Sequence, residues 1–224
     1  MHYSRGVTRG DAGGGEALAG RSADAYAEHV EPTRREPRND EQSHVPEHDI
    51  EPDVTAGSAA SVALIVTGGT FDKAYDSIRG ELTLSKTHLP EILGMVGCTV
   101  PVRPVVETLK DSLEMTDEDR AVIASACAEA PEPRIIVTHG TDTMTETARV
   151  VLKAELNKTV VFTGAMVPFA VNGSDALFNL GGAFAAVQTL PAGVYVVMNG
   201  RVFRCDRVRK NRASGVFEDS DGDG

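Results

Sequence analysis

Short apolar runs alternate with longer amphipathic segments from residue 61 onward. The run Val62–Val66 is apolar at every position and ends in Gly68-Gly69, which is typical of a strand buried on both faces. Further β-rich runs span Thr99–Leu109, Arg134–Val137, Thr159–Phe162 and Gly193–Met198. Helical patterns span Leu89–Val96, Thr116–Ala130, Thr143–Leu156 and Ser174–Leu190. This alternation predicts an α/β fold, a three-layer domain around a mostly parallel, doubly wound (flavodoxin-like) sheet with right-handed crossovers.

Proline and turn residues refine two of these elements. Pro101 and Pro104 interrupt the Thr99–Leu109 run, and proline cannot donate to a sheet ladder, so this run is expected at an edge or as an irregular strand. Asn199-Gly200 favours a type I′ turn that leads from Gly193–Met198 into a further strand over Arg201–Cys205.

The first 60 residues have a different composition from the rest of the chain. Val, Ile, Leu and Phe number only six there, too few to bury the apolar surface that offsets the entropy of ordering. We therefore expect a disordered acidic tail over residues 1–60 and one α/β domain over 61–217. Residues 218–224 are expected to form a disordered acidic C-terminus.

Composition and charge exclude several classes of partner. The chain has 224 residues, 41% of them hydrophobic and 25% charged, as in a soluble globular protein. Its formal net charge of −11 disfavours binding to nucleic acid or to an anionic membrane. Three scattered cysteines (Cys98, Cys127 and Cys205) suggest packed, reduced thiols and neither a disulfide framework nor a metal site. The chain is therefore expected to be cytoplasmic, without cofactor or metal.

Small and hydroxyl residues follow four of the predicted strands. These segments are Thr67-Gly68-Gly69-Thr70, Lys110-Asp111-Ser112, Thr138-His139-Gly140-Thr141-Asp142-Thr143 and Thr163-Gly164-Ala165-Met166. Ligands of open α/β sheets bind at the carboxyl ends of the strands. Four such loops at one edge therefore predict a pocket that approaches a small ligand with hydroxyls and backbone N–H groups.

Each loop also has a purely structural interpretation. Gly68 and Gly69 could serve only a tight turn, and Asp142 could simply cap the following helix. Neither a Walker phosphate loop nor a dinucleotide fingerprint is present. No Ser or Cys nucleophile elbow lies near His139, so a packed, hydrogen-bonded histidine is the better expectation for it.

Together these loops resemble the bacterial-type L-asparaginase family. The family's two signatures correspond to TGGT (67–70) and THGTDTMTET (138–147), with TGAM (163–166) beside them, and the segment Met198–Lys210 is similar to the one that leads to the active-site lysine. The resemblance extends from about Ser61 to Arg212 and corresponds to the family's N-terminal domain.

The resemblance implies hydrolysis of a side-chain amide to a carboxylate and ammonia through a threonine nucleophile. It makes Thr70 the nucleophile and pairs Thr141 with Lys210. Asp142 would hold the α-amino group of the substrate and Ser112 its α-carboxylate. Further expected site residues are Gly69, Asp111, Gly140 and Ala165 as pocket lining and Tyr75 as a possible stand-in for the family's lid tyrosine.

The sequence departs from the family pattern at three points. Leu113 stands where active members usually carry a substrate-binding glutamine, and the family's lid tyrosine lies further beyond the nucleophile than Tyr75 does. The segment that resembles the family also ends before its C-terminal domain. We therefore expect weak amidohydrolase activity on asparagine or glutamine unless a homo-oligomer covers the pocket. Two alternatives remain open. One is an inactive or weakly active amino-acid-binding module that keeps the pocket, and the other is an amidotransferase component that delivers ammonia to a partner.

Overall fold

The computed structural model describes residues 61–220; the predicted tail 1–60 and residues 221–224 lie outside the described residues. Its strands are β1 (Val62–Gly68), β2 (Ala74–Asp76), β3 (Glu81–Thr83), β4 (Val102–Lys110), β5 (Arg134–Thr138), β6 (Thr159–Thr163), β7 (Gly193–Met198), β8 (Arg201–Arg204), β9 (Val208–Asn211) and β10 (Val216–Asp219). Its α-helices are α1 (Leu89–Met95), α2 (Asp117–Glu129), α3 (Met144–Lys153) and α4 (Ala176–Thr189). Short 3-10 turns are η2 (Thr70–Asp72), η3 (Ser112–Glu114) and η4 (Cys205–Arg207).

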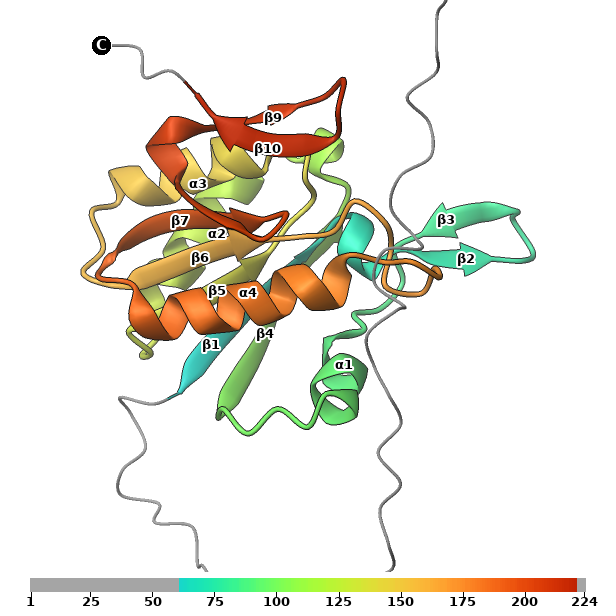
Figure 1. Ribbon diagram of the computed structural model, residues 1–224, viewed down its shortest axis with the longest axis horizontal. Coiled ribbons are helices and arrows are strands. Elements are labelled where there is room, and N and C mark those ends of the chain that lie inside the picture. Colours follow the sequence, from blue (N-terminus) through green and yellow to red (C-terminus); the bar gives the residue numbers. More distant parts are fainter. Residues whose placement is uncertain (1–60, 221–224) are drawn as a thin grey trace, which may run out of the picture. The chain divides into compact units, whose positions relative to one another are not determined.

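The central sheet has the strand order β4-β1-β5-β6-β7-β8 (Figure 1). The first five strands are parallel, and β8 runs antiparallel to β7. If the five parallel strands are renumbered 1 to 5 in chain order (β1, β4, β5, β6, β7), their order across the sheet is 2-1-3-4-5. This is the flavodoxin-like arrangement. The predicted fold class is confirmed, and its topological switch point lies between β1 and β5.

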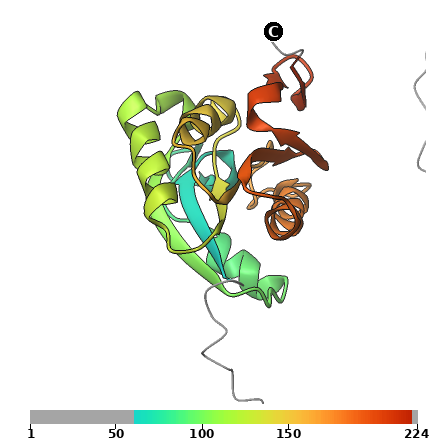
Figure 2. The ribbon, with the colours of Figure 1, turned by 90° about the vertical axis from the view of Figure 1, so that its left-hand side faces the viewer.

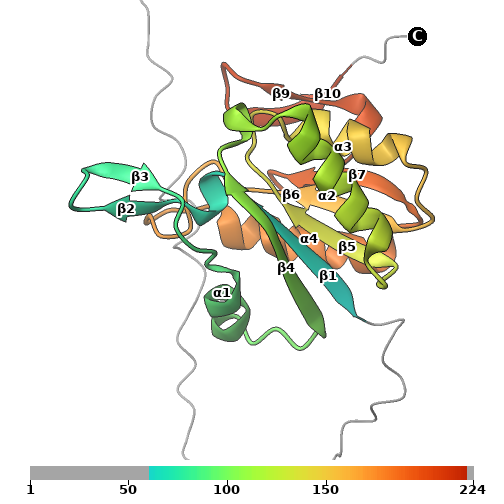
Figure 3. The ribbon, with the colours of Figure 1, turned by 180° about the vertical axis from the view of Figure 1, so that it is seen from behind.

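Helices cover both faces of the sheet, as Figures 2 and 3 show from two sides. Residues of β1 alternate between the two cores: Ile65 packs with the residues of α2 and α3, whereas Leu64 packs with those of α1 and α4. All seven residues of β1 are buried. The uninterrupted apolar run of this strand therefore has a direct cause, since each face of the sheet meets a helical layer.

One crossover departs from the expected right-handed rule. The connections through α3 and α4 both step in the same direction across the sheet, yet α3 and α4 lie on opposite faces (Figure 2). The β6–α4–β7 crossover is therefore left-handed. In the segment between β6 and α4, Phe169 donates its backbone N–H to the Phe71 carbonyl (3.3 Å) and packs against His88, which directly precedes α1.

Several local predictions are confirmed. The proline-containing strand β4 is an edge strand of the sheet. Asn199 and Gly200 both have positive φ (54° and 74°), as a type I′ turn requires. The predicted helical segment Thr116–Ala130 forms α2, which Thr116 caps in a capping box with Asp119.

Two hairpins were not predicted from the hydrophobic pattern, because their strands are three or four residues long. One pairs β2 with β3, and the other pairs β9 with β10. Strand β10 includes Glu218 and Asp219, so the ordered domain extends past the predicted boundary at 217. Ion pairs of Glu218 with Arg209 (2.8 Å) and of Asp219 with Arg201 (2.6 Å) hold this acidic end.

The three cysteines are free thiols, as expected. Burial raises the pKa of Cys127 to about 12 and that of Cys205 to about 11, which keeps both sulfurs protonated and unreactive. Within residues 61–220, no helix is long and apolar enough to cross a membrane.

Candidate active site

Three strand-end loops are stacked so closely that only small residues fit between them. A Cβ atom on Gly69 would lie 2.3 Å from the Gly140 Cα, and one on Gly140 would lie 2.6 Å from the Ser112 Oγ. Gly69 also donates its backbone N–H to the Lys110 carbonyl (2.9 Å). The loops after β1, β4 and β5 therefore meet at the switch point, which brings the segments of Thr70, Ser112 and Thr141 together.

The loop after β6 joins the same edge. A Cβ atom on Gly164 would lie 2.4 Å from the His139 carbonyl oxygen, so this loop also lies directly against the loop after β5. Two hydroxyls at the strand ends have structural partners: Thr67 donates to the Thr138 carbonyl (2.8 Å) and Thr163 to the Val197 carbonyl (2.9 Å). These two threonines are fully buried, and each joins the ends of two neighbouring strands.

Thr141, Asp142 and Lys210 form a compact polar cluster at this edge. The Lys210 Nζ lies 2.7 Å from the Thr141 Oγ1 and 2.9 Å from the Asp142 Oδ1. The side chain of Lys210 is 10% exposed, whereas that of Asp142 is 35% exposed. The predicted pairing of Lys210 with Thr141 is thus present, although β9 delivers the lysine from a position 69 residues away along the chain.

Thr70 is half-buried at the start of η2, directly after Gly69. Gly69 has φ 79° and ψ −170°, a conformation that is essentially restricted to glycine. This conformation turns the chain sharply out of β1, so that Thr70 begins a new turn at the sheet edge next to the loop of Thr141 and Asp142.

Asp111 and Ser112 lie on the turn after β4. Ser112 is buried, and its carbonyl accepts a hydrogen bond from the Thr143 hydroxyl (2.7 Å). Asp111 forms an ion pair with Lys73 (2.5 Å), a residue that sequence reasoning missed. Burial raises the pKa of the Asp111 carboxyl, but hydrogen bonds from Lys73 and from the Leu113 N–H outweigh it and hold this pKa below its usual range. Lys73 thereby cross-links the turn of Thr70 to the turn of Ser112.

The remaining predicted residues have different surroundings. Ala165 is fully buried and can line the site only through its backbone. Tyr75 is 66% exposed on β2, in the hairpin that extends away from the sheet (Figures 1 and 3), so this conformation does not bring it to the Thr141 cluster. Leu113 is also exposed, beside Ser112.

Asp175 and Asn179 were missed because polar residues at a helix start usually indicate only a cap. The Asp175 carboxylate accepts the backbone N–H groups of Met166 (3.0 Å) and Val167 (2.9 Å) and the side-chain amide of Asn179 (2.8 Å). Asn179 is almost completely buried and also donates to the Gly164 carbonyl (3.0 Å). These bonds fix the shape of the loop after β6.

His139 is a packed histidine, as predicted. It is fully buried, with Nδ1 2.8 Å from the Gly140 carbonyl and Nε2 2.8 Å from the Thr147 hydroxyl. Since a carbonyl only accepts, Nδ1 bears the proton and Nε2 accepts from Thr147. Burial lowers the pKa of His139 to about 4. Its neutral ring supports the Gly140 peptide, directly before Thr141.

This buried ring predicts acid sensitivity of the fold. Between pH 6.5, the ordinary pKa of histidine, and about pH 4, His139 binds a proton in the unfolded chain but not in the folded chain. The free energy of unfolding should therefore fall as pH falls through this window, by about 1.4 kcal/mol per pH unit at most. Urea unfolding at several pH values would measure this slope in the original chain and in His139→Gln.

The glutamine variant should be less stable at pH 7 but should lose less stability on acidification. Asp72 is present in both proteins, and burial raises its pKa. Its contribution to the free energy of unfolding therefore rises as pH falls, opposite to that of His139, and it cancels when the pH slopes of the two proteins are compared. Equal slopes in the two proteins would contradict the assignment to His139.

No group of three or more His, Cys, Asp or Glu side chains within residues 61–220 is arranged to hold a metal ion. The polar groups at the sheet edge are instead hydroxyls, two lysine side chains and two carboxylates, in the pairs Lys210–Asp142 and Lys73–Asp111. These groups can hold a zwitterionic small molecule and transfer protons to it.

A flavodoxin-like sheet with a hydroxyl, lysine and carboxylate cluster at its switch point defines the class of protein, an α/β domain with a candidate small-molecule site. The family model described as "Asparaginase, N-terminal" matches residues 61–218. The chain belongs to the asparaginase family, which confirms the resemblance seen in its sequence.

Individual relatives agree with this assignment. The chain is 34% identical over 175 residues to a glutamyl-tRNA(Gln) amidotransferase subunit of Pyrobaculum aerophilum, covering 68% of this chain and 40% of that protein. It is 29% identical over 165 residues to L-asparaginase 1 of Escherichia coli, covering 69% and 48%. The solved structure of the thermostable L-asparaginase from Thermococcus kodakarensis superposes with a TM-score of 0.63 at 26% identity, covering 71% and 51%. The chain thus spans about half the length of these relatives.

Proposed function

We propose that this protein is an amidohydrolase that converts the side-chain amide of asparagine or glutamine to a carboxylate and ammonia. The observation that supports this function most strongly is the position of the Lys210 Nζ, 2.7 Å from the Thr141 hydroxyl and 2.9 Å from the Asp142 carboxylate. Such a hydroxyl, amine and carboxylate triad is suited to move protons during acyl transfer.

In the proposed reaction the Thr70 hydroxyl attacks the amide carbon of the substrate. The bond from carbon to nitrogen then breaks, and ammonia leaves with the proton that the hydroxyl gave up. A water molecule attacks the resulting ester, releases the carboxylate product and restores Thr70. Thr141 and Lys210 would transfer the protons in both halves of the reaction, whereas Thr70, on the next loop, would form the ester.

Backbone groups are the natural stabilisers of the negative charge on the tetrahedral oxygen. The glycine contacts between the loops of Gly69 and Gly140 allow backbone to approach a ligand closely, because no Cβ atom intervenes. Preorganised N–H groups of this kind are worth about 3 kcal/mol of transition-state stabilisation each. The exposed part of Asp142 is available to the α-amino group of the substrate.

The test is ammonia release from L-asparagine and L-glutamine by the full chain. Glutamine belongs in the test because one relative is an amidotransferase component named for Gln and another is a glutaminase-asparaginase of Acinetobacter glutaminasificans. Activity is expected in the original chain and in Lys153→Met, which alters an exposed lysine at the far end of α3, and should be lost in Lys210→Met. Equal activity in all three would contradict the proposal.

Binding without turnover would favour the amino-acid-binding module instead. It would appear as a rise in melting temperature with aspartate in a protein that releases no ammonia. Specific activity that increases with protein concentration would support the proposed homo-oligomer, in which a second copy of the chain covers the pocket. The Campylobacter jejuni neighbour is titled a probable cytoplasmic L-asparaginase, and we propose the same compartment for this chain.

A further inference from the structure

Asn199 connects the turn between β7 and β8 to the hairpin that bears Lys210. The Asn199 Oδ1 accepts the backbone N–H of Phe217 (3.1 Å), on β10. Phe217 is the cross-strand partner of Lys210 in the β9–β10 register. One side-chain hydrogen bond therefore fixes the position of the residue that lies opposite the lysine.

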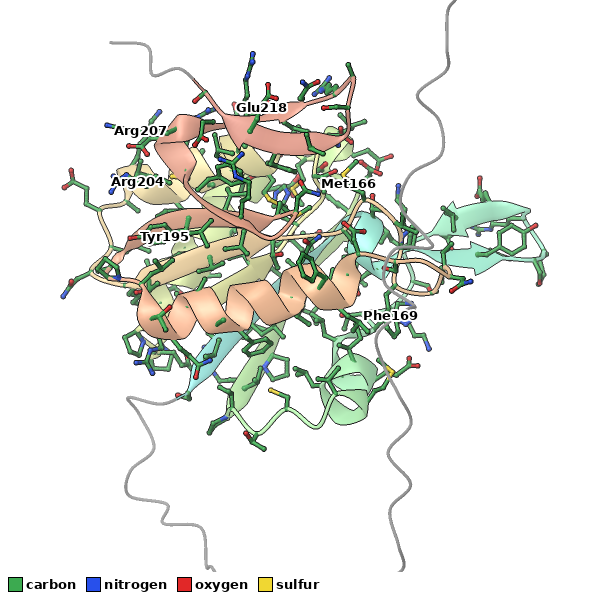
Figure 4. The ribbon with its side chains drawn as sticks, in the orientation of Figure 1. Met166, Phe169, Tyr195, Arg204, Arg207 and Glu218 are labelled. Atoms are coloured by element: carbon green, nitrogen blue, oxygen red, sulfur yellow. The ribbon has the colours of Figure 1, made fainter. Side chains whose placement is uncertain are left out.

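The other side of Asn199 leads back to the candidate site. Its backbone N–H donates to the Asn179 Oδ1 (3.1 Å), and the amide of Asn179 donates to the Gly164 carbonyl (3.0 Å) in the loop after β6. The turn of the hairpin meets the same loop, since a Cβ atom on Gly215 would lie 3.5 Å from the Met166 Cε. Figure 4 labels Met166 on this loop and Glu218 on β10. The β9–β10 hairpin and the loop after β6 are thus connected by hydrogen bonds through Asn199 and Asn179.

The turn itself does not require an asparagine side chain. Asn199 has φ 54° and is exposed, and glycine or aspartate would adopt this conformation equally well. Lys210, by contrast, must be held closely, because its Nζ bonds both Thr141 and Asp142 from a four-residue strand. The Asn199 side chain therefore serves the β9–β10 hairpin and is not needed for the turn.

We propose that Asn199 is a positioning residue for Lys210, acting through the Phe217 N–H and anchored to the site loop by Asn179. The catalytic part of this inference rests on the proposed amidohydrolase function. Asn179 itself is a poor test, because its removal leaves the Gly164 carbonyl and the Asn199 N–H without their partner in the interior.

The kinetic test compares Asn199→Gly with Asn199→Asp. The glycine variant keeps the turn and loses the acceptor for Phe217, so kcat for asparagine should fall about tenfold while KM changes less than about twofold. The aspartate variant keeps an acceptor and should retain kcat. A purely structural role would instead change KM together with kcat.

A second measurement does not depend on turnover. Acetylation with acetic anhydride, followed by peptide mass spectrometry, reports how accessible the Lys210 amine is. Lys210 should react slowly in the original chain and in Asn199→Asp, and several times faster in Asn199→Gly, with Lys153 as an unchanged internal reference. Absence of ammonia release together with this labelling pattern would reject the proposed function and keep the positioning role. Unchanged Lys210 labelling in Asn199→Gly would overturn the positioning role.

Discussion

Replacing Thr141 with alanine should lower ammonia release from asparagine by about 10²–10⁴-fold, the range that general acid–base groups contribute. The Thr141 hydroxyl lies 2.7 Å from the Lys210 Nζ and is only 4% exposed, so bulk water does not readily take its place. Without it, Lys210 keeps only its ion pair with Asp142 (2.9 Å) and loses the group through which it would exchange a proton. Steady-state ammonia assays on purified variants would measure this loss.

Two controls separate chemistry from packing. Thr141→Ser keeps a hydroxyl at the same atom position and should retain part of the activity. Thr159→Val removes a different buried hydroxyl, which bonds the Leu190 carbonyl (3.2 Å) at the amino end of β6. This variant should be slightly less stable and fully active. If Thr141→Ala and Thr159→Val showed the same activity, Thr141 would have no chemical role.

Replacing Gly69 with alanine should destabilise the fold by about 3–5 kcal/mol, because a strained backbone and a steric clash act at one position. The new methyl group would lie 2.3 Å from the backbone of Gly140, and neither atom belongs to a flexible side chain. Relief of the clash would move the loop of Thr70 away from the loop of Thr141. Urea unfolding monitored by circular dichroism would measure the change, and activity should fall in the protein that remains folded.

Gly173 provides the matched control. It has φ 81°, close to the 79° of Gly69, but a Cβ atom there would meet nothing within 4 Å. Gly173→Ala should therefore show only the cost of a positive φ, about 1–2 kcal/mol. The excess destabilisation of Gly69→Ala measures the contact between the loops together with the added strain of its ψ of −170°. Equal destabilisation would mean that this contact tolerates a methyl group and that the loops are not closely coupled.

The strands of the central sheet and the α-helices follow directly from local patterns. The apolar run at β1 predicts a strand between two helical layers, and Pro101 and Pro104 predict that β4 lies at an edge. Both predictions depend on short-range chemistry, namely the burial of neighbouring side chains and the missing N–H of proline. Parallel strands also bring their carboxyl ends to one edge, so the loops containing Thr70 and Thr141 could be assigned to one site from the sequence alone.

Contacts between distant segments could not be predicted in this way. The sequence contains no local signal that pairs Lys73 with Asp111, and the short strands β2, β3, β9 and β10 show no periodicity long enough to recognise. The left-handed crossover through α4 could not be predicted either, because it depends on which face of the sheet α4 packs against. The position of Lys210 was implied only by family resemblance, and residues separated by 69 positions meet through packing that no local pattern records.

The sequence by itself therefore determined the layered fold, the loops that form the site and the hydroxyl and carboxylate groups those loops provide. It could do so because alternation, capping and strand-end chemistry act over a few residues. Only the tertiary structure decided which of these groups touch. It brings Lys210 to Thr141 and Asp142, joins Lys73 to Asp111 and leaves Tyr75 exposed on its hairpin, since these outcomes depend on the close approach of glycine loops and on hydrogen bonds between distant strands.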